Sequence, residues 1–151
     1  MKTGIGGLLL LLAAPLPLQA QALPGADREA VRQAVMDYVE GFYQGDSTRF
    51  VRSVRPEVYK FGFFIPRDSS KYQGRSMTWP EFHAFANRVK ANGRPAAPTA
   101  PKEVVIYEVL DQTASAKLTA YWGIDYLLLG KFDGRWMITH VLWQTPPRRQ
   151  D

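Results

Sequence analysis

An acid, an imidazole and an indole in the last third of the sequence could together form a chemical site. Trp122 and Asp125 stand on either side of a Gly-Ile pair, and His140 lies in the last apolar run. A carboxylate and an imidazole within hydrogen-bond reach can move a proton to and from a carbonyl compound. Asp125 and His140 are therefore the expected catalytic pair, and either of them could be the base.

Two turn signals predict which of these side chains face each other. Asp133-Gly134 is typical of a type I′ hairpin, and Gly123-Ile124 has glycine at the first central position, as a type II′ turn requires. Two-residue loops at both positions would place Trp122 opposite Asp125. His140 would then lie diagonal to Asp125 on the same inner face, roughly 7 to 8 Å away between backbone positions.

A weaker turn signal at Gln112-Thr113 adds a further strand to this sheet. It would place Glu108 opposite Lys117 on the outer face, where opposite charges favour the register. Tyr107 and Glu103 would then lie on the inner face, near the candidate pair.

Two aromatic residues in the expected helices complete the candidate site. Tyr38 lies on the apolar face of the first helix, and Trp79 lies at the start of the third. Aromatic residues at helical spacing are usually core residues, so a packing role is the alternative for both. The expected ligand-binding residues are Tyr107, Trp122, Trp79 and Tyr38.

Three helices are expected ahead of the sheet. Residues 27–43 carry apolar side chains at helical spacing, with Asp27 as the N-cap. A second, short helix follows Gly45-Asp46 and stops before Pro56, and residues 78–81 form the capping box of a third. The pattern further predicts a strand at 58–65 and loops at 66–74 and 91–101. Helices followed by a meandering antiparallel sheet indicate an α+β fold.

The two ends of the chain are expected to lie outside the domain. Lys2, an uncharged apolar run and the small-x-small pattern Ala20-Gln21-Ala22 predict a signal peptide at residues 1–22. The protein would then be periplasmic or secreted, with an uncleaved anchor as the alternative. Residues 23–147 are expected to form one domain, followed by a basic tail at 148–151.

Composition argues against several classes of function. The chain has no cysteine and only two histidines, so neither a disulfide nor a metal site is expected. No glycine-rich phosphate loop is present, and no cofactor is expected. Its 19 basic residues against 14 acidic ones are spread along the chain, so no nucleic-acid partner is expected. No membrane contact is expected beyond export.

The order of these elements, the segment from Asp125 to Ile138 and the trailing Trp143 resemble the nuclear-transport-factor-2-like superfamily. Within it, the chain is similar to the putative lumazine-binding family, which is close to polyketide-cyclase-like and ketosteroid-isomerase-like proteins. The resemblance implies a cone-shaped, curved antiparallel sheet wrapped around about three N-terminal helices, with a pocket at its wide end. It also implies a homodimer formed through the outer sheet face. The chain has Arg55-Pro56 where the family commonly has His-Pro.

Three functions remain open from the sequence. The first is an exported pocket protein that binds a small apolar or aromatic molecule against the aromatic residues, with Asp125 and His140 fixing its orientation. The second is an isomerase or dehydratase in which the same pair transfers protons. The third is a dimeric interaction module that uses the sheet face of Tyr121, Tyr126 and Thr139. Whether the chain is an enzyme stays open.

Overall fold

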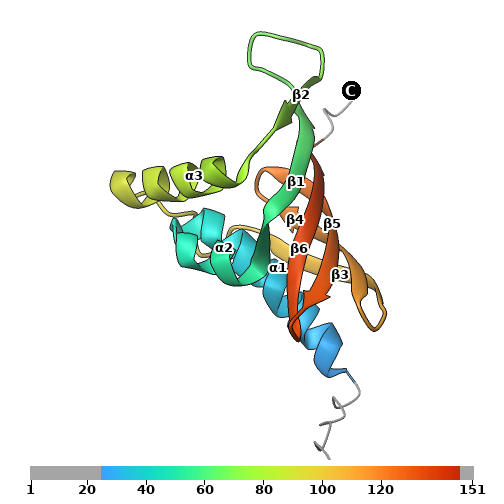
Figure 1. The fold of residues 1–151 in the computed structure, drawn as a ribbon. Helices are drawn as coiled ribbons and strands as arrows, with labels where there is room; N and C mark the ends of the chain where they lie inside the picture. The colour runs from blue at the N-terminus through green and yellow to red at the C-terminus, as the bar shows by residue number, and fades with distance from the viewer. Residues whose placement is uncertain (1–24, 147–151) are drawn as a thin grey trace, which may run out of the picture.

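The structure, a computed structural model, describes residues 25–146 (Figure 1). The predicted signal peptide at residues 1–22 and the basic tail at 148–151 lie outside the described residues. The helices are α1 (Ala26–Gln44), α2 (Ser47–Ser53) and α3 (Trp79–Asn92). The strands are β1 (Val54–Phe64), β2 (Gln73–Ser76), β3 (Lys102–Val109), β4 (Thr113–Ala120), β5 (Gly123–Phe132) and β6 (Arg135–Gln144).

The six strands form one curved sheet in the order β2-β1-β6-β5-β4-β3, with β2 and β3 as its open edges (Figure 1). The predicted α+β class is confirmed. The expectation of a wholly antiparallel sheet is wrong at one pair, because β1 runs parallel to β6. The chain leaves β1 and β2, crosses through α3 and returns as the meander of β3 to β6, whose last strand comes to lie beside β1.

The sequence pattern does not indicate edge strand β2. The sequence pattern predicts a loop at residues 66–74. In the structure, Gln73–Ser76 pairs antiparallel with Phe61–Phe64 at the end of β1. All four β2 residues are exposed, so the segment has no apolar alternation to indicate a strand. Its pairing with β1 extends one wall of the site described below.

All three helices lie on one face of the sheet, and the core fills the space between the two layers (Figure 1). Helix α1 contributes Val31, Val35 and Val39, which are fully buried against inward side chains of the sheet such as Leu118 and Ile138. Among residues 25–146, no helix is both long and apolar enough to cross a membrane.

Of the two predicted helix N-termini, the one of α3 is confirmed and the one of α1 is not. The predicted capping box of α3 is confirmed, since the Thr78 backbone N–H donates to Glu81 Oε2 at 2.6 Å. The expected N-cap role of Asp27 is wrong, because Gly25 occupies that position. Asp27 lies in the first turn of α1 and accepts hydrogen bonds from Lys131 Nζ at 2.7 Å and Trp136 Nε1 at 2.9 Å.

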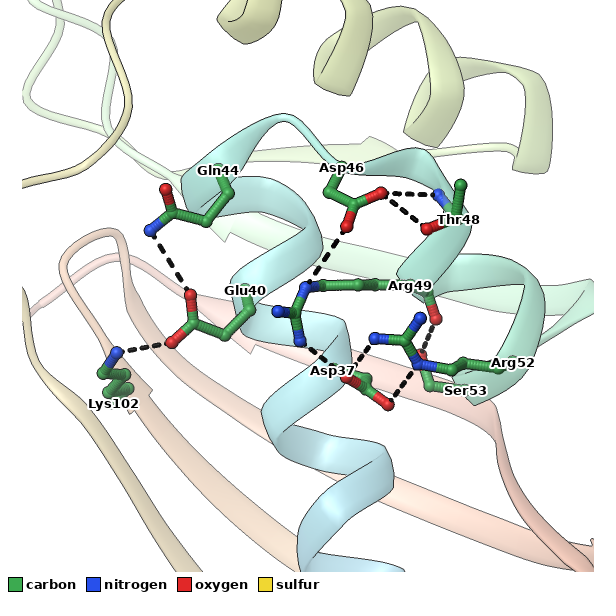
Figure 2. Close-up of polar contacts among 9 residues, drawn as sticks. All are labelled: Asp37, Glu40, Gln44, Asp46, Thr48, Arg49, Arg52, Ser53 and Lys102. Carbon is green, nitrogen blue, oxygen red and sulfur yellow. Dashed lines mark hydrogen bonds and ion pairs between the residues drawn. The ribbon is translucent and has the colours of Figure 1, made fainter.

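A buried carboxylate holds α2 against α1 (Figure 2). Asp37 on α1 accepts a hydrogen bond from Arg49 Nη1 at 2.7 Å, and two from Arg52, from Nε at 2.7 Å and Nη2 at 2.8 Å. Burial alone would raise the pKa of Asp37, but the hydrogen bonds and charge of Arg52, together with Arg49, outweigh it and lower that pKa. On the other side of α1, Glu40 pairs with Lys102 of β3.

Candidate functional site

Four buried or partly buried polar side chains meet between the sheet and α1. Asp125 on β5 is 0% exposed, and its two carboxylate oxygens accept hydrogen bonds from Tyr38 Oη and Trp122 Nε1, each at 2.7 Å. Lys60 Nζ on β1 donates to the Tyr38 hydroxyl oxygen at 2.6 Å. A continuous hydrogen-bonded chain therefore runs from the amine through the phenol to the carboxylate.

Lys60 is directed inward by the alternation of β1. Its neighbours at two-residue spacing, Val58 and Gly62, are also buried, and Lys60 itself is only 7% exposed. Its Nζ lies 4.6 Å from the ring centroid of Phe42 and 5.8 Å from that of Trp122. Burial lowers the pKa of Lys60 to about 8, an effect that the negative charge of Asp125 partly opposes.

Burial has the opposite effect on the phenol between the two charged groups. It raises the pKa of Tyr38 well above its ordinary value, and the charge and hydrogen bond of Asp125 raise it further. Tyr38 therefore keeps its hydroxyl proton at neutral pH, donates it to Asp125 and offers an oxygen lone pair to Lys60.

A cavity of about 490 Å³ opens above this cluster. Its walls come from α1, α3, β1, β2, the turn between β4 and β5, and the end of β6. The lining residues are Phe42, Lys60, Phe64, Arg75, Ser76, Met77, Phe85, Arg88, Tyr121, Trp122, Trp143 and Thr145. Aromatic rings dominate the walls, and the charged side chains among the lining residues are all cationic. That combination suits a flat molecule that carries negative charge.

One wall of the cavity depends on a glycine. Gly62 on β1 pairs with Trp143 on β6, and a Cβ atom at residue 62 would lie 2.2 Å from Cδ1 and Nε1 of the indole. The indole therefore lies flat against the strand backbone. Its ring is also stacked on Phe64, with 12° between the two planes.

Of the residues expected from the sequence, Asp125, Trp122 and Tyr38 come together. The expected turn at Gly123-Ile124 is wrong, because Ala120 pairs with Gly123 and the loop is Tyr121-Trp122. This shift keeps Asp125 on the inner face, since it moves the pairing by an even number of residues. Gly123 is needed for a different reason: its φ is +137°, and a Cβ atom there would lie 2.0 Å from the carbonyl oxygen of Gln144.

The expected contact between His140 and Asp125 is wrong. A β-bulge at Thr139 inserts one residue into β6, so His140 pairs with Leu128 and Val141 takes the position opposite Leu127. His140 is exposed on the outer face of the sheet, where its Nδ1 lies 3.1 Å from Thr139 Oγ1.

A second bulge removes Tyr107 from the site. In β3, Ile106 pairs with Ala116 and Glu108 with Ser115, which leaves Tyr107 unpaired. Tyr107 is 56% exposed, so its expected inner position is wrong. The bulge also turns Glu103 outward, because the pairing beyond it shifts by one residue.

Trp79 packs beside the site without lining the cavity above Lys60. Its ring lies 4.7 Å from that of His83 and 6.0 Å from that of Phe82, at the start of α3. It borders a smaller hollow of about 320 Å³ between β1 and that helix. The sequence does not single out Lys60, Arg75 or Arg88 as residues of the site. For Lys60, the alternation of Val58, Lys60 and Gly62 along β1 is the one signal that its side chain faces inward.

A broader hollow of about 630 Å³ lies near the start of β4 and the end of β5, and His140 is one of its lining residues. It has no buried network of titratable groups of the kind that joins Lys60 to Asp125. We therefore place the candidate site in the cavity above Lys60. Within residues 25–146, no three His, Asp or Glu side chains gather as metal ligands would.

Comparison with known proteins supports the resemblance seen in the sequence. A family model described as putative lumazine-binding matches residues 26–144. An NTF2-like protein of unknown function from Silicibacter pomeroyi aligns with a TM-score of 0.64 and 15% identity, over 83% of this chain and all of the other. An NTF2-like protein of unknown function from Shewanella baltica aligns with a TM-score of 0.59 and 21% identity, over 84% of this chain and 99% of the other.

A third solved structure is named after an enzyme activity. It is a putative scytalone dehydratase from Novosphingobium aromaticivorans, with a TM-score of 0.55 and 12% identity, over 80% of this chain and 85% of the other. At these identities the solved structures show the fold alone. No curated protein matches the chain.

Proposed function

We propose, because this chain belongs to the putative lumazine-binding family of the NTF2-like superfamily, that it binds a flat, anionic aromatic molecule in the cavity above Lys60. The observation that carries this proposal is the buried amine of Lys60, surrounded by aromatic rings in a cavity of about 490 Å³. Cavities of this size suit small ligands when apolar walls are combined with a few convergent polar groups.

The charges of the cavity favour an anion. Lys60 lies among the aromatic rings, and the exposed Arg75 and Arg88 also line the cavity. The carboxylate of Asp125 is already occupied by Tyr38 and Trp122, so the cavity has no free acid to repel an anionic ligand. The family description points to a lumazine, whose fused heteroaromatic ring and ring carbonyls are compatible with these walls.

The proton-transfer alternative loses one of its two expected groups. A general base must lie within hydrogen-bond reach of the proton that it abstracts. His140 lies on the outer face, whereas Asp125 faces inward, so the two cannot act on one substrate molecule in this cavity. Ligand binding therefore remains the better-supported function.

We also propose that the protein is exported and acts as a homodimer. The basic residue, apolar run and cleavage pattern within residues 1–22 support export. Large apolar side chains on the outer face of the sheet support the dimer, since Tyr126, Leu128 and Leu142 are each half exposed there. Apolar side chains gathered on an open sheet face are a common basis for association.

Calorimetric titration with 2-naphthoate tests the binding proposal. This probe has a flat fused ring and one carboxylate, and 2-methylnaphthalene serves as its neutral counterpart. We expect the naphthoate to bind with one site per chain and more tightly than the neutral molecule. Arg88→Gln should weaken naphthoate binding, whereas Arg67→Gln, an exposed residue outside the cavity lining, should not. Equal affinity for the two probes would contradict an anion site.

A further inference from the structure

The amine of Lys60 has an unusual position for a lysine. The hydrogen bond that it donates goes to a neutral phenol, Tyr38 Oη at 2.6 Å, and not to a carboxylate. It is buried, yet it lines a cavity large enough for a small molecule. A desolvated amine in an apolar pocket is the form of lysine that acts as a nucleophile toward carbonyl compounds.

We infer that Lys60 captures an aromatic aldehyde or ketone covalently, as an imine, at the floor of the cavity. This inference rests on the proposed binding function and names the reactive group of the ligand. In this reaction the amine adds to the carbonyl carbon, and the carbonyl oxygen leaves as water. The C=O double bond is replaced by a C=N double bond, no oxidant or reductant takes part, and hydrolysis returns both partners.

The hydrogen-bonded chain gives the protons of this reaction a route. A proton leaving Lys60 Nζ passes to Tyr38 Oη as Tyr38 passes its own proton to Asp125 Oδ2, 2.7 Å away. The addition product then transfers a nitrogen proton to its oxygen; when that hydroxyl leaves as water, Asp125 returns a proton to Tyr38 and Tyr38 donates one to the departing oxygen. Tyr38 is in contact with the reacting amine and carries the proton, whereas Asp125 acts through Tyr38.

Burial also increases the reactive form of the amine. With a pKa of about 8, roughly one Lys60 side chain in ten is neutral at pH 7, about 300-fold more than for an ordinary lysine. The ionisable groups nearest this amine are Tyr38 and, through it, Asp125. Arg75, Arg88 and Tyr121 are the other ionisable side chains that line the same cavity.

The test uses the full chain, 6-formyl-2-naphthoate as the probe and cyanoborohydride to fix the imine. Intact mass should show one adduct per chain, and peptide mapping should place it on Lys60. We expect Lys60 to be labelled at least about tenfold faster at pH 7 than any other lysine, with a rate that rises through pH 8. Lys71→Met, which alters an exposed loop lysine, should leave the labelling unchanged, and Lys60→Met should abolish the fast phase.

The outcomes separate this inference from the binding proposal. Labelling of Lys60 that is no faster than that of Lys71, in a protein that still binds 2-naphthoate, would overturn the imine and leave the binding site standing. If Lys60 is not labelled selectively and the protein does not bind 2-naphthoate, both the imine and the binding site are overturned. Tyr38→Phe should slow the labelling of Lys60 and change the dependence of its rate on pH, because the hydrogen-bonded route from Lys60 to Asp125 is broken. A lower rate with the same pH dependence would show that Tyr38 and Asp125 do not carry the proton.

Discussion

The indole of Trp143 lies flat over the α-carbon of Gly62 on the neighbouring parallel strand. The place of a Cβ atom at residue 62 is already occupied, with the indole atoms Cδ1 and Nε1 both 2.2 Å from it. Trp143 in turn forms part of the cavity wall together with Phe64. Because Gly62 has no side chain, the Trp143 indole can lie against the strand, and this position of the indole sets the width of the proposed binding site.

Gly62→Ala should push the indole toward the cavity. Overpacking of this kind typically costs about 1 to 3 kcal/mol of the free energy of unfolding. We also expect the affinity for 2-naphthoate to fall about tenfold, the equivalent of ~1.4 kcal/mol. Urea unfolding and calorimetric titration measure the two effects.

The matched control removes the indole itself. In a Trp143→Ala background, Gly62→Ala should change the free energy of unfolding by less than about 0.5 kcal/mol, because the clash has gone. A cost that persisted in this background would show that Gly62 matters for a reason other than Trp143.

Lys60 should impose a pH dependence on stability at alkaline pH. Its pKa is about 8 in the folded protein and 10.5 as an ordinary lysine, so between these values the unfolded chain binds more protons. The contribution of Lys60 to the free energy of unfolding should therefore rise as pH increases from about 8 to 10.5. Below pH 8 both states hold the proton and the contribution is constant.

Comparison with Lys60→Met isolates this effect. The stability of the wild type relative to Lys60→Met should climb across that pH range in urea-unfolding experiments. Lys71→Met should follow the wild type throughout, because its amine is exposed in both states. Parallel pH curves for the wild type and Lys60→Met would contradict a depressed pKa at residue 60.

Asp37→Asn should destabilise the contact between α1 and α2 at neutral pH. Loss of the charge-assisted hydrogen bonds from Arg49 and Arg52 should cost about 1 to 3 kcal/mol of the free energy of unfolding. The pKa of Asp37 is lowered, so its contribution is present above the ordinary pKa of an aspartate and is lost as pH falls through the folded value.

The exposed pair of Arg55 and Glu57 supplies the control for Asp37. Glu57→Gln should cost less than about 1 kcal/mol at pH 7, as is usual for surface pairs. The deficit of Asp37→Asn should shrink as the pH approaches 2. An equal deficit at pH 7 and pH 2 would show that the effect arises from packing.

Tyr126→Arg tests the proposed dimer. This residue is half exposed on the outer sheet face, and a charge there should prevent two such faces from packing together. Light scattering should give the mass of two chains for the wild type and of one chain for the variant. Val51→Arg, an equally exposed apolar position on α2, should remain dimeric. A monomeric wild type would rule out the dimer.

The fold could be predicted because local signals and global pattern agree in this chain. The capping box at Thr78, the hairpin at Asp133-Gly134 and the inward alternation of Leu118, Leu127 and Leu129 all recur in the structure. Each depends on short-range chemistry or on a period of two, which the sequence displays directly.

The site could be predicted only in part. The strand alternation correctly predicts that Asp125 faces inward, but the bulges at Tyr107 and Thr139 reverse which side chains of β3 and β6 face inward beyond them. A bulge adds one residue without a distinctive sequence signal, and one residue is enough to move a side chain from one face to the other. Lys60 was missed because burial of a lysine depends on partners in α1 and β5, which only the tertiary structure brings together.

The indole N–H signals of the protein provide a built-in comparison for the proposed site. The chain has four tryptophans; Trp122 and Trp143 line the cavity, whereas Trp79 packs on His83 and Trp136 donates to Asp27. In proton–nitrogen correlation spectra of the labelled protein, addition of 2-naphthoate should shift the indole signals of Trp122 and Trp143 and leave those of Trp79 and Trp136 in place. Shifts confined to Trp79 or Trp136, or no shift at all, would contradict binding above Lys60.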